Sequence, residues 1–495
     1  MEKLTQLIGS LDKIEINLVR RYYLYSKQKE NLLRNKLFDL LINNPGIKQS
    51  RIAEELKISL SGSSFSVLQK RLIDDILKIL LVAQGPKKFP SKYREAKYRC
   101  GLLLVEIDVL LNKGSNETLL MDKIYQAERL ANKFELNNEK IIINDHKKEY
   151  IGRRKGPDVY NKAHANDLDN FKIVREKLEA QDFFRKLIMP NLFLTNKEVN
   201  FTQQAIESTE QLRILSEKNS SAHIKYYYLR SSIYCNHLLN NYILAKEYAI
   251  EFYKLIKENK ILYSSDNVGG AFMLLATISI YLGDGEKAIE YANNGSPYFH
   301  KSSINMATLN ENLFLGYLMI KDYERANEVV NVVTSYKIIK TKAFLKAKWL
   351  YYKANLLFAQ GLYSETLSLL QKQSALLADK SGWRLGYKIL EMMCIIELDN
   401  SSWLDYRVET FRKLLANVKN ENIQRPKMIL YIIKQFIRNA YNFTVTNQQC
   451  EDKLKFLTEA KNDFRYDPKG YEVIRFDEWW FQKTNELNRK RAQIN

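Results

Sequence analysis

The sequence predicts an all-α protein: an α-solenoid of stacked helix pairs, preceded by a small helical domain. Four similar turns between apolar helices recur from residue 240 to 366, and no stretch shows a convincing strand pattern. Only 18 Gly and 8 Pro occur in 495 residues, which suits long helices joined by few turns. The predicted domains are a basic helical domain (1–90), the solenoid (91–460), and an aromatic cap with a frayed tail (461–495).

The four turns share a pattern of residue types. They are NNYILA (240–245), GDGEKA (283–288), KDYERA (321–326) and GLYSET (361–366). The first position is Asn, Gly or Lys, which we expect to end a helix tightly or in the left-handed conformation. The sixth position is Ala or Thr, small enough for the second helix to approach the first closely. One such pair cannot bury its apolar face alone, so consecutive pairs are expected to stack.

These turns resemble those of the tetratricopeptide repeat, although the intervals of 43, 38 and 40 residues between the small residues exceed the ~34 of that family. The resemblance implies a concave face that binds a protein or peptide. Polar side chains on the first helix of each pair are its expected lining, where Lys and Asn would hold acidic groups or the peptide backbone. The candidate partner-binding residues are Lys225, Arg230, Asn236, Asn310, Lys346, Lys353 and Asn355.

In the first hundred residues the sequence predicts several short helices. Residues 12–28 are expected to form one helix with Ile14, Leu18 and Tyr22 on one face. Further helices are expected at 32–42, 49–56 and 63–82, with a break at Pro45–Gly46. On the last of them one face is apolar and comprises Phe65, Leu68, Leu72, Ile76 and Ile79.

The run IKQSRIAEELKIS (47–59) resembles a helix-turn-helix of the winged-helix kind. Core positions are then expected at Ile47, Ile52, Ala53 and Leu56. The resemblance implies that Ser63 and Ser64 begin the helix that enters the DNA major groove. Side chains that could reach DNA are Ser61, Ser63, Ser64, Ser66, Gln69, Lys70 and Arg71. The alternative is a helical cap or protein-docking domain without DNA contact.

Positive charge is concentrated near the N-terminus. Residues 1–100 contain 20 Lys or Arg and 10 Asp or Glu, so they carry half of the net charge of +20. Within the segment 85–99 basic residues alternate with aromatic ones, a pattern that can bind nucleic acid. Its candidate contacts are Lys87, Lys88, Lys92 and Arg94. The alternative is a linker with solvated lysines on a soluble, lysine-rich surface.

Two later stretches carry structural expectations. Residues 160–189 are expected to form one long helix ended by Pro190, with Phe171, Val174, Leu178 and Leu187 inward. The aromatic stretch 464–483 is expected to fold back over the last helix pair, because the end of a solenoid exposes an apolar face. The alternative is an exposed docking motif for a partner.

No motif for catalysis, cofactor or metal binding is found. The four Cys and five His lie far apart without CxxC, HxxxH or HExxH spacing, and no GxSxG, P-loop or GxGxxG occurs. No apolar stretch approaches 18 residues, so no membrane partner is expected. The sequence therefore predicts a cytoplasmic, non-enzymatic binding scaffold without cofactor. The alternative is a transcriptional regulator with an N-terminal DNA-binding domain and a sensing or dimerising solenoid.

Overall fold

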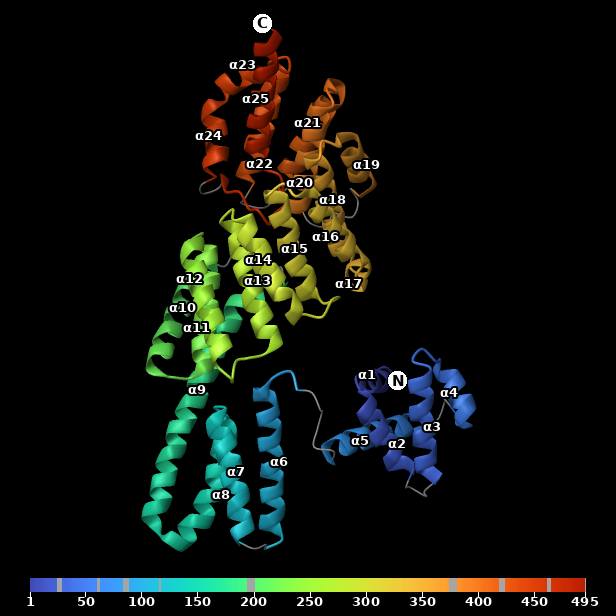
Figure 1. The fold of residues 1–495 in the computed structure, drawn as a ribbon, viewed down its shortest axis with the longest axis vertical. Coiled ribbons are helices and arrows are strands. Elements are labelled where there is room, and N and C mark those ends of the chain that lie inside the picture. Colours follow the sequence, from blue (N-terminus) through green and yellow to red (C-terminus); the bar gives the residue numbers. More distant parts are fainter. Residues whose placement is uncertain are drawn as a thin grey trace. The chain divides into compact units, whose positions relative to one another are not determined.

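The structure is a computed structural model that describes residues 1–24, 29–59, 63–82, 89–114, 117–193, 201–373, 381–417, 423–460 and 464–494. Every regular element within these ranges is a helix, so the all-α fold class is confirmed (Figure 1). By contact the chain divides into two compact units, Met1–Ala131 and Asn132–Asn495. The domain limits at residues 90 and 460 stay predictions. No helix in the described ranges has both the length and the apolar character that a bilayer crossing requires.

The first unit contains a five-helix cluster followed by two longer helices. Its helices are α1 (Glu2–Gly9), α2 (Lys13–Leu24), α3 (Lys29–Asn43), α4 (Gln49–Leu56), α5 (Ser63–Val82), α6 (Lys92–Asn112) and α7 (Glu117–Lys133), the last of which crosses the unit limit. Helices α1 to α5 share one apolar core. The predicted face of α5, from Phe65 to Ile79, is buried in it. Ile52, Ala53 and Leu56 are also buried, and Ile47 packs against the core, as expected.

The predicted face of α2 is wrong for two of its three residues, whereas Leu18 packs against the shared core. Ile14 and Tyr22 are 44% and 50% exposed, and the buried positions are instead Glu15, Val19 and Tyr23. Two polar interactions account for this rotation. At the helix start Glu15 accepts a hydrogen bond from the Asp12 N–H (2.8 Å) while its own N–H donates to the Asp12 carboxylate. Further along, the Tyr23 hydroxyl donates to Asp75 of α5 at 2.8 Å.

The second unit begins with α8 (Asn137–Lys155), α9 (Pro157–Phe193) and α10 (Phe201–Lys218). The expectation that Pro190 ends the long helix is wrong, because α9 runs to Phe193. Phe171 and Leu178 are exposed, whereas Leu187 is buried as expected. Periodicity alone misplaced this face because its buried positions include Asp167, which pairs with Lys148 of α8 at 2.5 Å.

Four helix pairs follow with tetratricopeptide-like turns. They are α11 (Ala222–Leu238) with α12 (Tyr242–Glu258), α13 (Ser265–Tyr281) with α14 (Gly285–Gly295), α15 (Ile304–Met319) with α16 (Tyr323–Ser335), and α18 (Ala343–Ala359) with α19 (Tyr363–Gln373). A short α17 (Lys337–Thr341) precedes the last pair. Consecutive helices pack against each other, as Figure 1 shows for α11 to α16. The predicted stacking is therefore confirmed.

The turn chemistry of these pairs is as the sequence predicts. The first residues of the four turns, Asn240, Gly283, Lys321 and Gly361, all have positive φ, between 59° and 79°. The next residue in three turns caps the second helix through its side chain, as Asp284 does by accepting from the Lys287 N–H at 3.0 Å. The small residues at the sixth position are fully buried, namely Ala245, Ala288, Ala326 and Thr366.

The last helices are α20 (Ser381–Glu397), α21 (Ser401–Ala416), α22 (Gln424–Arg438), α23 (Phe443–Gln449), α24 (Glu451–Glu459) and α25 (Phe476–Ile494). The aromatic stretch packs over them: Phe476 and Trp480 are fully buried, and the Trp480 ring lies against Phe436 and Phe443. The prediction that this stretch covers the last helices is confirmed, although Phe481 stays 38% exposed.

Candidate functional site

The coil between α24 and α25 turns back along the earlier helix pairs. Figure 1 shows this coil in red, near the yellow helix α15, which it contacts. Its residues 465–471, RYDPKGY, contact residues on or next to the first helices of successive pairs. We call these residues the 465–471 loop, and we call the surface that it touches the contact face. The contact face includes Tyr242, Tyr281, Glu311, Asn312, Tyr351 and Gly386.

At the centre of the contact face the loop inserts a lysine. The Lys469 ammonium donates to the Asn312 side-chain oxygen at 2.5 Å and lies 3.3 Å from a carboxylate oxygen of Glu311. The other Glu311 oxygen pairs with Lys348 of α18 at 2.7 Å. Asn312 is oriented by Thr277 of α13, to whose hydroxyl its amide donates at 3.0 Å. One buried carboxylate thus balances two lysines, one of which belongs to the loop.

Electrostatics favour a cation at this position. Burial raises the pKa of the Glu311 carboxyl, but the positive charges of Lys469 and Lys348 outweigh burial and lower this pKa to about 2. Burial also lowers the pKa of Lys469, and the charge of Glu311 opposes that effect only in part. Glu311 is therefore ionised at neutral pH, and the loop lysine is held at a desolvation cost.

An aromatic cluster receives the start of the loop. Tyr242 and Tyr281 stack with ring centroids 4.8 Å apart, and His237 of α11 meets the Tyr281 ring edge to face. The Arg465 guanidinium lies over the Tyr242 ring at 5.5 Å, a cation–π contact. Burial lowers the pKa of His237, and the positive charge of Arg465 lowers it further, so this imidazole is neutral at pH 7.

The end of the loop is held through its backbone. The Tyr351 hydroxyl of α18 donates to the Tyr471 carbonyl oxygen at 2.6 Å. On α20, a Cβ at Gly386 would lie 2.0 Å from the same oxygen. Glycine is therefore required at 386 for the loop backbone to pass this close to the helix.

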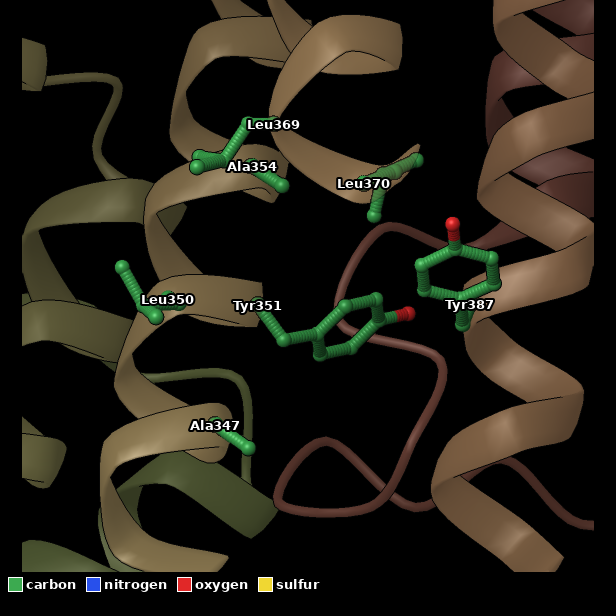
Figure 2. A pocket seen from close by; sticks show the side chains of 7 residues that line it. All are labelled: Ala347, Leu350, Tyr351, Ala354, Leu369, Leu370 and Tyr387. Carbon is green, nitrogen blue, oxygen red and sulfur yellow. The ribbon is translucent and has the colours of Figure 1, made fainter. Parts of the chain in front are cut away.

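A small apolar pocket lies beside this backbone contact. It is lined by Ala347, Leu350, Tyr351, Ala354, Leu369, Leu370 and Tyr387. Figure 2 shows Tyr351 from α18 extending toward Tyr387 from α20, with coil in the colour of the C-terminal region beside them. Apart from the two phenol groups the lining is aliphatic, so the pocket is almost entirely apolar.

The structure does not place the predicted partner-binding residues together on one surface. Asn355 and Asn310 are buried, and their amides donate to the Tyr351 carbonyl and the Tyr336 hydroxyl, so neither reaches a surface. Lys346 and Lys353 lie on α18 roughly 160° and 140° around the axis from Lys348, since each residue turns about 100°. Lysine 348, which the prediction omitted, is the α18 lysine that contacts Glu311.

The three partner-binding candidates on α11 each contact other residues of the chain. Lys225 pairs with Glu251 of α12 at 2.9 Å, and the Asn236 amide donates to the Ser232 carbonyl. Arg230 lies between the rings of Phe184, Tyr226 and Phe252. It precedes His237 by seven residues, or about two turns, and so faces the same side of the helix. Partner binding by these residues stays a prediction.

The nucleic-acid candidates lie on α5 and α6 of the first unit. Ser63, Ser64, Lys70 and Arg71 are exposed on α5, and Ser63 and Lys70 lie opposite its buried face. Lys92 and Arg94 are exposed at the start of α6. Gln69 is half-buried, and its side-chain oxygen accepts a hydrogen bond from the Met1 amino group at 2.9 Å. Ser61, Lys87 and Lys88 lie outside the described residues.

Sequence reasoning missed Glu311, Asn312, Tyr351 and Gly386, and it did not predict that residues 465–471 contact the earlier helix pairs. Two signals pointed to them. The polar run Asn310–Glu311–Asn312 interrupts an otherwise apolar helix, and Gly386 lies in a helix interior, where glycine costs about 1 kcal/mol relative to alanine. A glycine in that position often marks a close approach of another backbone. Neither signal names the segment that approaches.

The described ranges also contain possible metal ligands and four cysteines. No group of three or more His, Cys, Asp or Glu there could hold a metal ion. All four cysteines are buried, and they form no disulfide bond with one another. Burial raises the pKa values of the Cys235, Cys394 and Cys450 thiols, which keeps these side chains protonated at neutral pH.

We compared the chain with protein families, with curated proteins and with solved structures. No protein-family model matches the sequence, and no curated protein matches it. Among solved structures, the crystal structure of the apo form of RapI is similar at a TM-score of 0.40 and 14% sequence identity, covering 80% of this chain and 98% of that one.

Proposed function

We propose that this chain is a non-enzymatic binding protein whose contact face holds a segment of a partner protein or peptide. One observation carries the proposal: the face already holds a polypeptide segment, its own 465–471 loop. The Tyr351–Tyr471 contact recognises a main-chain carbonyl, which every peptide offers. The Glu311 and Asn312 oxygens select a cation, and the Tyr242 ring accepts an arginine. These contacts are of the kinds that hold peptides on protein surfaces.

The test selects peptides against a full-length chain in which the loop has lost its two cationic contacts, Arg465→Ala with Lys469→Ala. A phage-displayed library of random peptides is used, and enriched peptides are synthesised and titrated by fluorescence anisotropy. Glu311→Gln should weaken their binding by about 10-fold or more, because a hydrogen bond to a charged group contributes about 1.5–3 kcal/mol. Glu251→Gln is the matched control, since Glu251 pairs with Lys225 on the α11–α12 pair, away from the Glu311 subsite.

Two results would count against the proposal: no enriched peptide, or equal binding by the Glu311→Gln chain. The double reversal Lys346→Glu with Lys353→Glu examines the lining predicted from sequence. Loss of peptide binding by this variant would show that Lys346 and Lys353 belong to the peptide-binding surface. Unchanged binding is the result that we expect from their position on α18.

DNA binding by the first unit is a second candidate function. It is favoured by the exposed side of α5, where Ser63 and Lys70 lie opposite the buried face and Ser64 is exposed beside them. The full-length chain is titrated with random duplex DNA and RNA at two salt concentrations. If α5 contacts phosphates, reversing Lys70 and Arg71 to Glu should weaken binding and reduce the salt dependence by about two counterions. Reversal of the exposed Lys13 and Lys36 is the control, and absence of binding at low salt would reject this function.

A further inference from the structure

The 465–471 loop is anchored independently of the contact face. Just before it, the Phe464 ring stacks on Phe456 of α24, with centroids 5.5 Å apart. Just after it, the Glu472 carboxylate pairs with Arg425 of α22 at 2.6 and 2.7 Å and accepts the Phe476 N–H. Both ends therefore stay attached to the C-terminal helices whether or not the loop itself touches the contact face.

The contacts between the loop and the contact face are mainly polar. They include the Lys469 interactions with Glu311 and Asn312, the Arg465 contact with Tyr242, the interaction of Asp467 with Tyr281 and the hydrogen bond to the Tyr471 carbonyl. The Lys469 contact also carries a desolvation cost, and Asp467 at the tip of the turn is exposed. Release of the loop would break these contacts and leave the Arg425 network and the buried Trp480 in place.

Release would also uncover groups that need a replacement. Glu311 and Asn312 are buried oxygen acceptors that would lose the loop cation, and Tyr351 would lose its acceptor. Buried polar groups are costly without partners, so an incoming segment that supplies an ammonium group and a carbonyl compensates for the loss.

We propose that the 465–471 loop is a displaceable internal ligand, and that the outside partner is a peptide segment that presents a lysine to Glu311 and Asn312 and a main-chain carbonyl to Tyr351. This inference rests on the proposed function and adds both the chemical class of the ligand and a competition for the site. An outside segment competes with a tethered one whose effective concentration is on the order of millimolar. Weak ligands therefore do not displace the loop from the contact face, whereas peptides that match the chemistry of the loop do.

The probe is a labelled synthetic peptide of residues 464–474, FRYDPKGYEVI, with a second peptide in which the lysine is replaced by norleucine. Full-length wild type is compared with the Arg465→Ala, Lys469→Ala chain by fluorescence anisotropy. The variant should bind the lysine peptide at least about 10-fold more tightly than wild type, because the internal competitor is weakened. The norleucine peptide should bind the variant at least about 10-fold less tightly than the lysine peptide. Lys455→Ala, which removes an exposed lysine of α24, should behave as wild type.

A matched glycine pair locates the bound peptide. In the Arg465→Ala, Lys469→Ala background, Gly386→Ala should abolish binding, since its Cβ would lie 2.0 Å from the carbonyl oxygen at position 471. Gly382→Ala, one turn earlier on α20, places its Cβ at an ordinary 3.4 Å from the Tyr471 ring and should leave binding intact. Both changes replace glycine by alanine in the same helix, so helix propensity cannot explain a difference.

The outcomes separate the two proposals. Equal binding of the lysine peptide by wild type and the double variant overturns the internal competition. Binding that is indifferent to Gly386→Ala overturns the assignment of the peptide to this face. If library peptides bind through Glu311 while the 464–474 peptide does not, the proposed function stands and the internal-ligand inference fails.

Discussion

Replacing Arg425 by Met should destabilise the C-terminal helices by about 3–5 kcal/mol, the usual result of leaving a buried charge without its partner. Arg425 is 3% exposed and contacts Glu472 twice and Asp477 at 2.5 Å, both of which are also buried. Burial alone would lower the pKa of Arg425, but the two carboxylates outweigh burial and raise it. Without the guanidinium, the buried Glu472 carboxylate would lose its ion-pair partner, and Asp477 would keep only its pair with Arg475 among these contacts, at 2.6 Å.

Urea unfolding followed by tryptophan fluorescence measures this effect, because all five tryptophans lie between residues 349 and 480. Arg412→Met is the matched control: Arg412 is half-exposed and pairs with Glu409 on the helix surface, where such pairs contribute about 1 kcal/mol or less. If the Arg425 change lowered the free energy of unfolding no more than the Arg412 change, the Arg425 network would not be a main source of stability for the C-terminal helices.

Replacing Trp480 by Ala should cost about 3–5 kcal/mol, as for other large aromatic truncations in a core. The Trp480 ring is fully buried against Phe436, Phe443 and Phe476, and its indole N–H donates to the Asn447 side-chain oxygen at 2.6 Å. The truncation would leave a cavity and remove the donor from Asn447. Far-ultraviolet circular dichroism in urea is the measurement, since the change removes one fluorophore.

Trp403→Ala is the control for residue type. Trp403 is 47% exposed on α21. The Arg407 guanidinium lies over its ring, 5.4 Å from the centroid, in a cation–π contact. Removing the Trp403 side chain should lower the free energy of unfolding by about 1 kcal/mol or less. If both truncations had the same small effect, the aromatic stretch would not act as the cover of the last helices.

The repeat architecture was predictable because its determinants are local. A residue at the first position of each turn must end a helix, and positive φ at Asn240, Gly283, Lys321 and Gly361 satisfies this in every case. The fully buried Ala326 and Thr366 likewise follow from the sixth position of the same short motif. Such patterns span six residues and need no knowledge of the rest of the chain.

Failures occurred where a distant polar partner decides the orientation of a helix. The Tyr23–Asp75 hydrogen bond, which links α2 to α5, turns Ile14 outward although its spacing fits an apolar face. The same reason hid the contact face. Lys469 and Asn312 are 157 residues apart, and Tyr351 and Tyr471 are 120 apart, so no local period relates them. The sequence prediction chose Lys346 and Lys353 on α18, whereas the α18 lysine that pairs with Glu311 is Lys348.

Hydrogen exchange of the full-length wild-type chain tests the central claim most directly. Backbone amides of 465–475 are followed by mass spectrometry without peptide and with a saturating library-selected peptide. We predict faster exchange in 465–471 when the peptide is bound, with unchanged protection in α25, because Arg425 and Trp480 keep that helix in place. Unchanged exchange of the loop in the presence of bound peptide would contradict an internal ligand that gives way to an external one.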